Sequence, residues 1–128
     1  RLILADRYTT SNAVHQMTKL PENMWDAYLE WLFDFEYNKL SIPSPDCVIF
    51  LDMPVEISQR LMSERYDGNE GKKDVHERNV RYLLSCYETA KYAAEKLGWY
   101  VIKCSENGQP RSIDSIADEI YECVKKHI

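Results

Sequence analysis

Glycine is scarce in this chain of 128 residues, and its few glycines lie in the wrong places for a phosphate-binding loop. None of them follows a predicted strand and opens a helix. No stretch matches G-x-x-x-x-G-K-S/T, in which backbone N–H groups and a lysine surround nucleotide phosphates. The four are Gly68, Gly71, Gly98 and Gly108. These residues therefore contain no glycine loop for holding the phosphates of a nucleotide.

Three further absences narrow the class of protein. The four cysteines, at positions 47, 86, 104 and 123, form no C-x-x-C pair and have no histidines at zinc spacing. We therefore expect reduced thiols in a cytoplasmic protein. No run approaches the roughly 18 apolar residues that span a bilayer, so no membrane association is predicted. The net charge of −5 argues against a general nucleic-acid-binding surface.

Short apolar runs alternate with segments of helical periodicity, which is typical of an α/β parallel sheet. Predicted strands cover Leu2–Ala5, Cys47–Leu51 and Trp99–Lys103. Helices are predicted over 11–18 and 74–97, and three further helices are predicted to begin near residues 21, 54 and 112. A turn is predicted at 106–110. The 45% hydrophobic content suffices for one core, so we expect a single domain over residues 1–128.

Aromatic and aliphatic residues recur at helical spacing after Pro21, forming a broad apolar stripe. Its members are Trp25, Tyr28, Leu29, Leu32 and Phe33. A stripe of this kind usually faces a protein core, and a partner or dimer surface is the alternative.

The stretch from Asp6 to Gln16 follows directly on the apolar run Leu2–Ala5. It places a carboxylate and a guanidinium at a strand's carboxyl end, which is where ligands bind in open α/β sheets. Arg7 can grip a phosphate through two parallel hydrogen bonds, and Asp6 can hold magnesium, usually through water. This chemistry indicates a phosphorylated ligand, and an ordinary surface ion pair is the alternative.

Asp-Arg-Tyr at 6–8 and Ser-Asn-Ala-x-x-Gln at 11–16 together resemble the nucleotide-monophosphate signature of the thymidylate kinases. The resemblance continues through residues 43–52 and 64–67. It implies a P-loop nucleoside-monophosphate-kinase-like parallel sheet with helices on both faces and five strands in the order 2-3-1-4-5. Because this chain would carry only the last three strands, we expect an incomplete sheet in the C-terminal part of a longer protein. The missing N-terminal segment or another chain would fill the gap.

The resemblance assigns the acceptor site to residues around Arg7, which would bind the acceptor phosphate and take part in catalysis. Asp6 would lie next to the magnesium and its waters. His15 stands where the family often has a Tyr or Phe that packs near the deoxyribose and helps to exclude a 2′-hydroxyl. The histidine implies a weaker or more polar selection against ribonucleotides. The alternative for His15 is a helix residue hydrogen-bonded to backbone. Three further side chains would face the thymine or its sugar: Ser11, Asn12 and Gln16.

Residues 63–74 resemble the lid that closes over the phosphoryl donor. Phosphoryl transfer needs positive charge on the moving group and exclusion of water. The cationic candidates for catalysis are Arg65, Lys72 and Lys73, and solvated loop charges are the alternative. Tyr66 matches a substrate-side lid tyrosine found in part of the family.

The donor adenine is assigned to a second group of residues. Arg60 resembles the arginine that stacks on the adenine ring. Its alternative role is an ordinary helix-surface pair with Glu56, four residues earlier. The backbone around Cys104, Ser105 and Glu106 resembles the loop that closes the other side of the adenine pocket.

The leading interpretation is an ATP- and Mg²⁺-dependent thymidylate kinase that phosphorylates dTMP to dTDP as the intact protein. The 128 residues alone would be inactive without a P-loop. A deoxynucleoside kinase-like enzyme and a non-catalytic nucleotide-binding module are the alternatives. The expected partners are dTMP and ATP, with no nucleic acid polymer. A homodimer to which residues 25–35 contribute is a further expectation.

Overall fold

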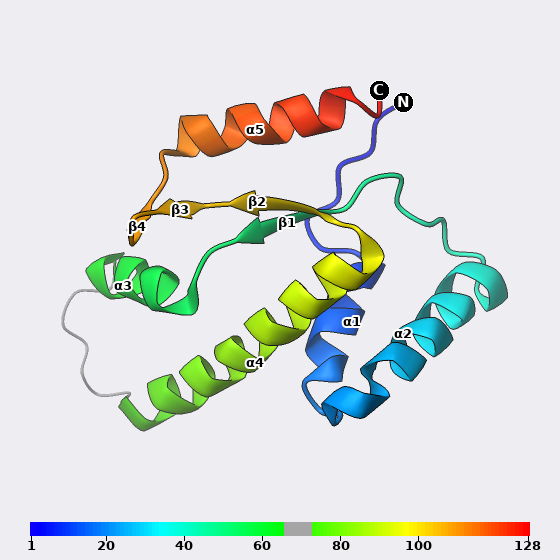
Figure 1. Cartoon of the computed structure of the whole chain (residues 1–128), viewed down its shortest axis with the longest axis horizontal. Coiled ribbons are helices and arrows are strands. Elements are labelled where there is room, and N and C mark those ends of the chain that lie inside the picture. Colours follow the sequence, from blue (N-terminus) through cyan, green and yellow to red (C-terminus); the bar gives the residue numbers. More distant parts are fainter. Residues whose placement is uncertain (66–72) are drawn as a thin grey trace.

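The computed structural model describes the backbone of residues 1–65 and 73–128, and the side chains of residues 1–64 and 79–128. Helices and strands alternate along these parts of the chain (Figure 1). In order they are α1 (Thr9–Met17), the 3₁₀ turn η1 (Glu22–Met24), α2 (Trp25–Phe33), the π-helix η2 (Asp34–Lys39), β1 (Ile49–Asp52), α3 (Val55–Arg65), α4 (Lys73–Leu97), β2 (Tyr100–Lys103), β3 (Ser105–Glu106), β4 (Gln109–Pro110) and α5 (Ile113–Lys125).

The strands β1 and β2 pair in parallel, with Ile49 opposite Tyr100 and Asp52 opposite Lys103. Parallel strands need a long crossover, which α3 and α4 provide. Gly98 adopts a φ of +69° directly after α4, a conformation that suits glycine and lets the chain turn from the helix into β2. The predicted parallel α/β arrangement is thus confirmed, although the sheet is small.

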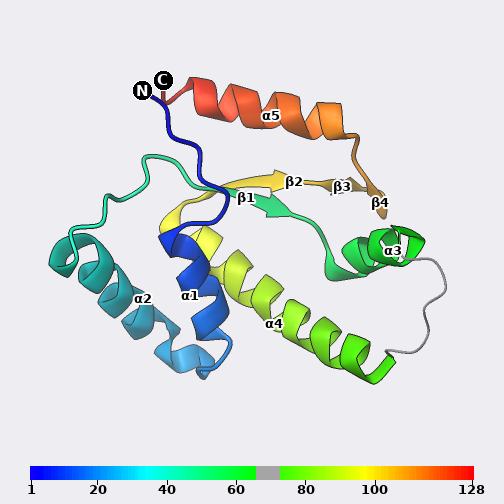
Figure 2. The same ribbon diagram turned by 180° about the vertical axis from the view of Figure 1, so that it is seen from behind.

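Helices cover both faces of the β1–β2 pair. The ribbon views from two sides place α5 over one face, and α4, with α1 beside it, over the other (Figures 1 and 2). This arrangement is compatible with a kinase fold. Within the described residues, no helix combines the length and apolar character that crossing a bilayer requires.

The main apolar core lies where α1, α2 and α4 meet. The aromatic stripe packs on it: Trp25, Tyr28 and Phe33 surround the buried cluster, and the Trp25 indole N–H donates to the Met17 carbonyl at 3.0 Å. Trp31 stacks on Phe35 on the outer side and is 54% exposed. The stripe is therefore mainly core. The fully packed members of the cluster are Ala13, Met17, Leu29, Leu32 and Ala93.

The predicted strand at Leu2–Ala5 is not formed. The segment has no strand assignment, and Leu2, Ile3 and Leu4 are 62%, 82% and 86% exposed. In the described part of the chain, the only sheets are β1–β2 and the β3–β4 hairpin. An apolar run can favour an extended backbone, but a strand also needs a neighbour that supplies hydrogen bonds. Among the described residues, no such neighbour lies beside Leu2–Ala5.

The predicted turn at 106–110 is confirmed as the tip of the β3–β4 hairpin. Glu106 pairs with Gln109, and the two residues between them, Asn107 and Gly108, have φ values of +51° and +75°. Asn-Gly suits a two-residue hairpin turn because both residues tolerate positive φ. The turn lies close to the carboxyl ends of β1 and β2.

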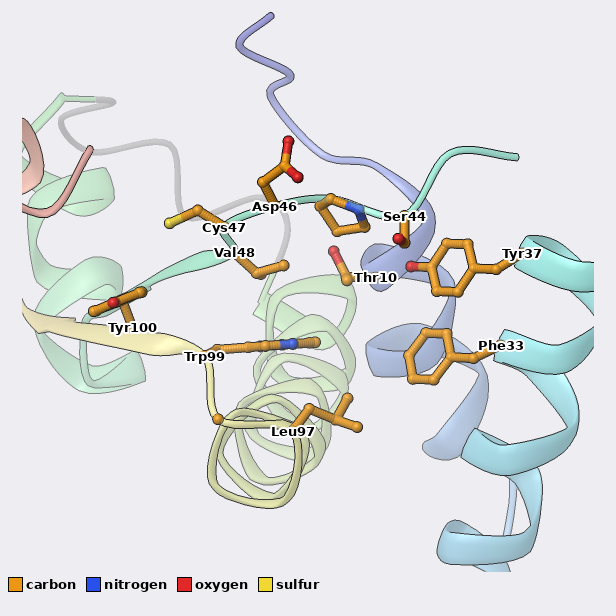
Figure 3. Close-up of a pocket in the computed structure, with 12 residues that line it drawn as sticks. Thr10, Phe33, Tyr37, Ser44, Asp46, Cys47, Val48, Leu97, Trp99 and Tyr100 are labelled. Atoms are coloured by element: carbon orange, nitrogen blue, oxygen red, sulfur yellow. The ribbon is translucent and has the colours of Figure 1, made fainter. Parts of the chain in front are cut away.

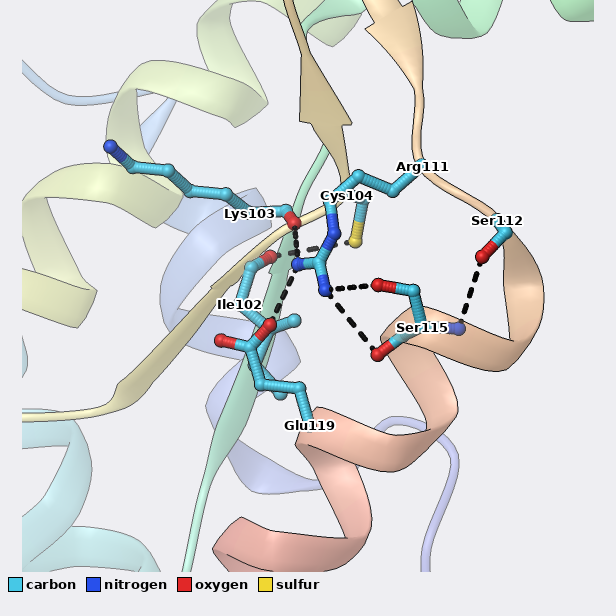
Figure 4. A network of polar contacts seen from close by, with 7 residues as sticks. All are labelled: Ile102, Lys103, Cys104, Arg111, Ser112, Ser115 and Glu119. Carbon is cyan, nitrogen blue, oxygen red and sulfur yellow. Dashed lines mark hydrogen bonds and ion pairs between the residues drawn. The ribbon is translucent and has the colours of Figure 1, made fainter.

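Arg111 ties this hairpin to β2 and α5 (Figure 4). Its guanidinium donates to the Lys103 carbonyl at 2.6 Å, to the Glu119 carboxylate at 2.7 Å and to the Ser115 hydroxyl at 2.7 Å. The Ser112 hydroxyl accepts from the Ser115 N–H and caps α5, as the sequence predicts. The Arg111 network itself joins residues that no sequence pattern connects.

Replacing Arg111 by Ala should lower the free energy of unfolding by about 1–3 kcal/mol, because backbone carbonyls lose a charged donor. Glu119→Gln is the control, since it weakens the ion pair but leaves the carbonyl bonds of Arg111. That pair is half exposed on the Glu119 side and should be worth less than about 1 kcal/mol. Urea denaturation of both variants, made in the protein that contains this chain, measures the difference, and equal losses would contradict this view of the network.

Candidate functional site

Arg7 stands at the turn between the N-terminal segment and α1, with a φ of +67°. This left-handed conformation is uncommon for a residue with a long side chain and costs on the order of 1–3 kcal/mol. Such strain persists where surrounding contacts impose it, and it is found most often at functional positions.

The Arg7 guanidinium is anchored to α1 by two side chains. Its Nε donates to the Ser11 hydroxyl at 3.0 Å, and its Nη2 donates to His15 Nε2 at 2.9 Å. The side chain is exposed, and none of the ion pairs among the described residues includes it. Among the described side chains Arg7 therefore has no carboxylate partner, and it keeps donor capacity toward solvent.

His15 is held as a neutral ring with its hydrogen on Nδ1. A guanidinium can only donate, so Nε2 must accept, and the neutral ring then carries its hydrogen on Nδ1. From Nδ1 the Tyr82 hydroxyl lies at 3.0 Å and the Cys86 sulfur at 3.5 Å. The ring is thus bonded to side chains, and the backbone hydrogen bond considered as its alternative role is not seen.

Burial, together with the neighbouring Arg7 charge, lowers the pKa of His15 below its ordinary value of 6.5. Both causes disfavour a second positive charge at this point. Cys86 is buried, and its sulfur faces Nδ1 at 3.5 Å.

Helix α4 connects this cluster to the last residue of β1. Tyr87 on α4 donates to the Asp52 carboxylate at 2.6 Å, so Tyr87 is level with the last residue of β1. Tyr82 precedes it by five residues, about 7.5 Å along the helix and away from the start of β2. The sequence predicts Arg7 at the carboxyl end of a strand over Leu2–Ala5. Because that strand is not formed, the position of Arg7 at a sheet edge stays a prediction.

Long-range contacts fix α1 in this position. The Thr89 hydroxyl of α4 donates to the Val14 carbonyl at 2.7 Å, and Thr9 at the start of α1 shares a 2.7 Å hydrogen bond with the Tyr37 hydroxyl. Because both ends of α1 are attached, Ser11 and His15 are presented to Arg7 by a rigid support.

Asn12 and Gln16, which are also predicted to face the thymine or its sugar, have different surroundings. Asn12 is exposed and close to Glu36 of η2, a carboxyl group whose pKa is raised by burial and lowered in part by the Asn12 amide. Glu36 Oε1 is buried without a hydrogen-bond partner among the described residues. Gln16 accepts from Lys19 at 3.2 Å on the surface. The structure thus joins Ser11 and His15 to Arg7, and Asn12 to Glu36.

Arg60 lies against the β3–β4 hairpin. Its Nη2 donates to the Gly108 carbonyl at 2.9 Å and to the Gln109 side chain at 3.2 Å. The ion pair with Glu56 is not formed among the described residues. Arg60 is therefore brought next to the hairpin that begins with Ser105 and Glu106, although the two regions lie far apart in sequence.

Cys104 has a structural role at the start of the β3–β4 hairpin. Its N–H donates to the Asp52 carbonyl and its carbonyl accepts from the Arg111 N–H. Burial raises the pKa of its thiol, and the nearby Arg111 charge opposes this shift. These contacts fix the start of the hairpin.

Part of the predicted site lies outside the described residues. Tyr66 and Lys72 fall there, as does most of the predicted lid over 63–74. Arg65 and Lys73 are described only as the last residue of α3 and the first residue of α4. Their assignments stay predictions.

Asp6, the predicted magnesium neighbour, is exposed beside Arg7. Among the residues searched, no three His, Cys, Asp or Glu side chains come together as a metal site. Magnesium is commonly bound by one or two carboxylates together with substrate phosphates and water. A single exposed carboxylate therefore fits a magnesium ion that arrives with a nucleotide.

A cavity of about 260 Å³ lies at the opposite end of the strands (Figure 3). Phe33, Tyr37 and Asp46 line it, together with Val48 and Trp99, which directly precede β1 and β2. None of the predicted site residues lines this cavity. Ligands of parallel α/β sheets bind beyond the carboxyl ends of strands, so this cavity does not correspond to the predicted site.

Sequence reasoning missed Tyr82, Cys86 and Glu36. Tyr82 and Cys86 are four residues apart on the predicted helix 74–97, so a shared face could be inferred. Their contact with His15 spans 67 and 71 residues of sequence. No pattern in one sequence could show it.

Two curated proteins are similar to the chain in sequence. They are thymidylate kinases of Mycobacterium tuberculosis, from strains CDC 1551 / Oshkosh and ATCC 25618 / H37Rv, and each is 28% identical over 80 residues. The match covers 62% of this chain and only 37% of each relative. No family model and no solved structure matches. The chain thus matches little more than a third of the length of these relatives.

His15 should make the stability of the protein depend on pH. Because folding lowers the pKa of His15 below 6.5, the unfolded chain binds a proton more readily than the folded one. The stabilisation is full above this value and is lost as pH falls through 6.5 toward the lower folded pKa. Urea denaturation of the protein that contains this chain, between about pH 7.5 and about pH 5, should show a steeper loss for wild type than for His15→Gln. Parallel profiles would contradict the lowered pKa.

Proposed function

We propose that the protein containing this chain is an ATP- and Mg²⁺-dependent kinase that phosphorylates dTMP to dTDP. The observation that carries the proposal is the Arg7 guanidinium, which is exposed and oriented by Ser11 and His15. The partial similarity to thymidylate kinases supports the same enzyme class.

In this proposal Arg7 holds the phosphate of dTMP, and Asn12, with Ser11 and Gln16 nearby, faces the thymine or its sugar. Arg60 and the hairpin around Ser105 and Glu106 would hold the adenine of ATP. Asp6 would contact the magnesium ion, which neutralises phosphate charge when it is bound. Positive charge on the transferred group would come from Arg65, Lys72 and Lys73, and Tyr66 would contact substrate from the lid.

The proposal also requires polypeptide outside these 128 residues, to complete the sheet and supply the phosphate-binding loop. Three observations support this part. Leu2, Ile3 and Leu4 are exposed, and Leu51 of β1 is 50% exposed. The accessible surface is 9687 Å², against about 7,000 Å² expected for a compact monomer of this mass. A strand beside β1 would cover apolar surface and pair its free backbone groups.

Phosphorylation assays with dTMP and thymidine, using ATP and Mg²⁺, test the proposed activity. dTMP should be the better acceptor, because its phosphate gives Arg7 a partner that thymidine lacks. Preference for thymidine would favour a deoxynucleoside kinase, and no transfer to either would favour a non-catalytic nucleotide-binding protein.

Replacing Arg7 by Ala should weaken dTMP binding by about 10- to 100-fold, the loss expected for hydrogen bonds between charged groups. Lys39→Ala removes an exposed cation paired with Asp34 and serves as the control, with little expected effect. Equilibrium binding of dTMP distinguishes the two variants. Equal, small effects would remove Arg7 from the site.

The need for further polypeptide has its own test. The 128-residue chain, alone in dilute solution, should not show a cooperative thermal transition as a monomer, since its sheet edge and apolar surface stay uncovered. Circular dichroism melting combined with sedimentation analysis measures this. A sharp, concentration-independent transition of a monomer would contradict the proposal.

A further inference from the structure

We propose that Arg7 and His15 form a proton-linked site for a phosphomonoester dianion, in which His15 becomes a second cation when the ligand binds. The inference rests on the proposed function, because its ligand is the phosphate assigned to Arg7. It adds a donor and a pH dependence to that site.

The position of His15 Nε2 suits this role. It lies 2.9 Å from Arg7 Nη2, so a phosphate oxygen that reaches the guanidinium also arrives beside the imidazole. Nδ1 already carries its hydrogen toward Tyr82 and Cys86. A further proton can therefore be added only at Nε2, the nitrogen that faces the incoming anion.

The charges around His15 determine when this proton is taken up. The described groups that face the ring are the Arg7 cation, the neutral Tyr82 hydroxyl and the Cys86 thiol of α4. Burial and Arg7 lower the pKa of His15, and among the described residues no carboxylate contributes to this shift. Without a ligand, the imidazole is therefore neutral and serves as an acceptor for Arg7.

A phosphate dianion reverses this balance. Its two negative charges offset the guanidinium and favour a positive charge within a few ångströms. A proton from solvent then adds to Nε2, the Arg7–His15 hydrogen bond breaks, and both side chains donate to phosphate oxygens. The two cations match the two charges of the ligand, and one proton is taken up for each ligand bound.

The contacts around the ring make this exchange local. His15 is stacked on Tyr82, with ring centroids 6.1 Å apart, and its Nδ1 bonds are unaffected by a proton on Nε2. The ring can therefore change from acceptor to donor without leaving its place. Only the Arg7 side chain, which is exposed, has to shift.

Proton-detected NMR of ¹⁵N-labelled histidine tests the inference in the protein. The signal that is lost in His15→Gln assigns His15 in the protein that contains this chain. The pKa of His15 is measured without ligand, with saturating dTMP, and with thymidine, which lacks the phosphate. We expect dTMP to raise the His15 pKa and thymidine to leave it unchanged.

The affinity for dTMP should follow the same linkage. Between about pH 8 and about pH 6, wild type should gain about 3- to 10-fold in affinity relative to His15→Gln, since a rise of one in the pKa corresponds to a tenfold change in an equilibrium constant. The protonation of dTMP itself affects both proteins equally. The matched variant therefore isolates the contribution of His15.

The outcomes separate the two proposals. A raised His15 pKa with dTMP, together with loss of the pH-dependent gain in His15→Gln, supports the inference. Binding of dTMP that depends on Arg7 but leaves the His15 pKa unchanged or lower overturns the inference and leaves the proposed function standing. If dTMP does not bind, or if the Arg7→Ala substitution leaves its affinity unchanged, both the proposed function and the inference are overturned.

Discussion

The parallel pairing of β1 with β2 is the constraint on which the other elements depend. Two parallel strands cannot be joined by a tight turn, so the chain must cross back over the sheet through α3 and α4. The pairing also brings Asp52 and Lys103 to one edge, where the segments that follow them meet. Arg60 on α3 reaches the β3–β4 turn for this reason, and α4 returns along the opposite direction with Tyr82 and Cys86 on the side of α1.

The meeting of Arg7 with His15 has a chemical consequence that neither residue has alone. A guanidinium is always charged, so its neighbour must stay neutral or gain a compensating anion. The neutral imidazole satisfies this requirement in the free protein by accepting a hydrogen bond. The same pair is suited to a doubly charged ligand, because the imidazole can add a positive charge that the free protein disfavours. A single group of side chains thus accounts for the orientation of Arg7, the tautomer of His15 and the kind of ligand proposed.

Local signals in the sequence predicted those parts of the fold whose cause lies within a few residues. Ser112 caps α5 because its hydroxyl reaches an N–H three residues ahead, and Gly98 ends α4 because its backbone tolerates positive φ. Asn107 and Gly108 form the hairpin turn for the same reason. The run Leu2–Ala5 shows the limit of such signals. Its composition favours a strand, but a strand is a property of two segments, and composition describes only one.

The α/β alternation, the main helices and the chemical groups between Asp6 and Gln16 can be read from the sequence. Which of those groups are neighbours depends on the packing of the folded chain: Arg7 contacts His15, His15 contacts Tyr82 and Cys86, Asn12 lies close to Glu36, and Arg60 contacts the hairpin. The physical reason is distance along the chain. Helix periodicity, capping and turns act between neighbouring residues. Hydrogen bonds between side chains 67 or 71 positions apart exist only once packing has brought their helices together.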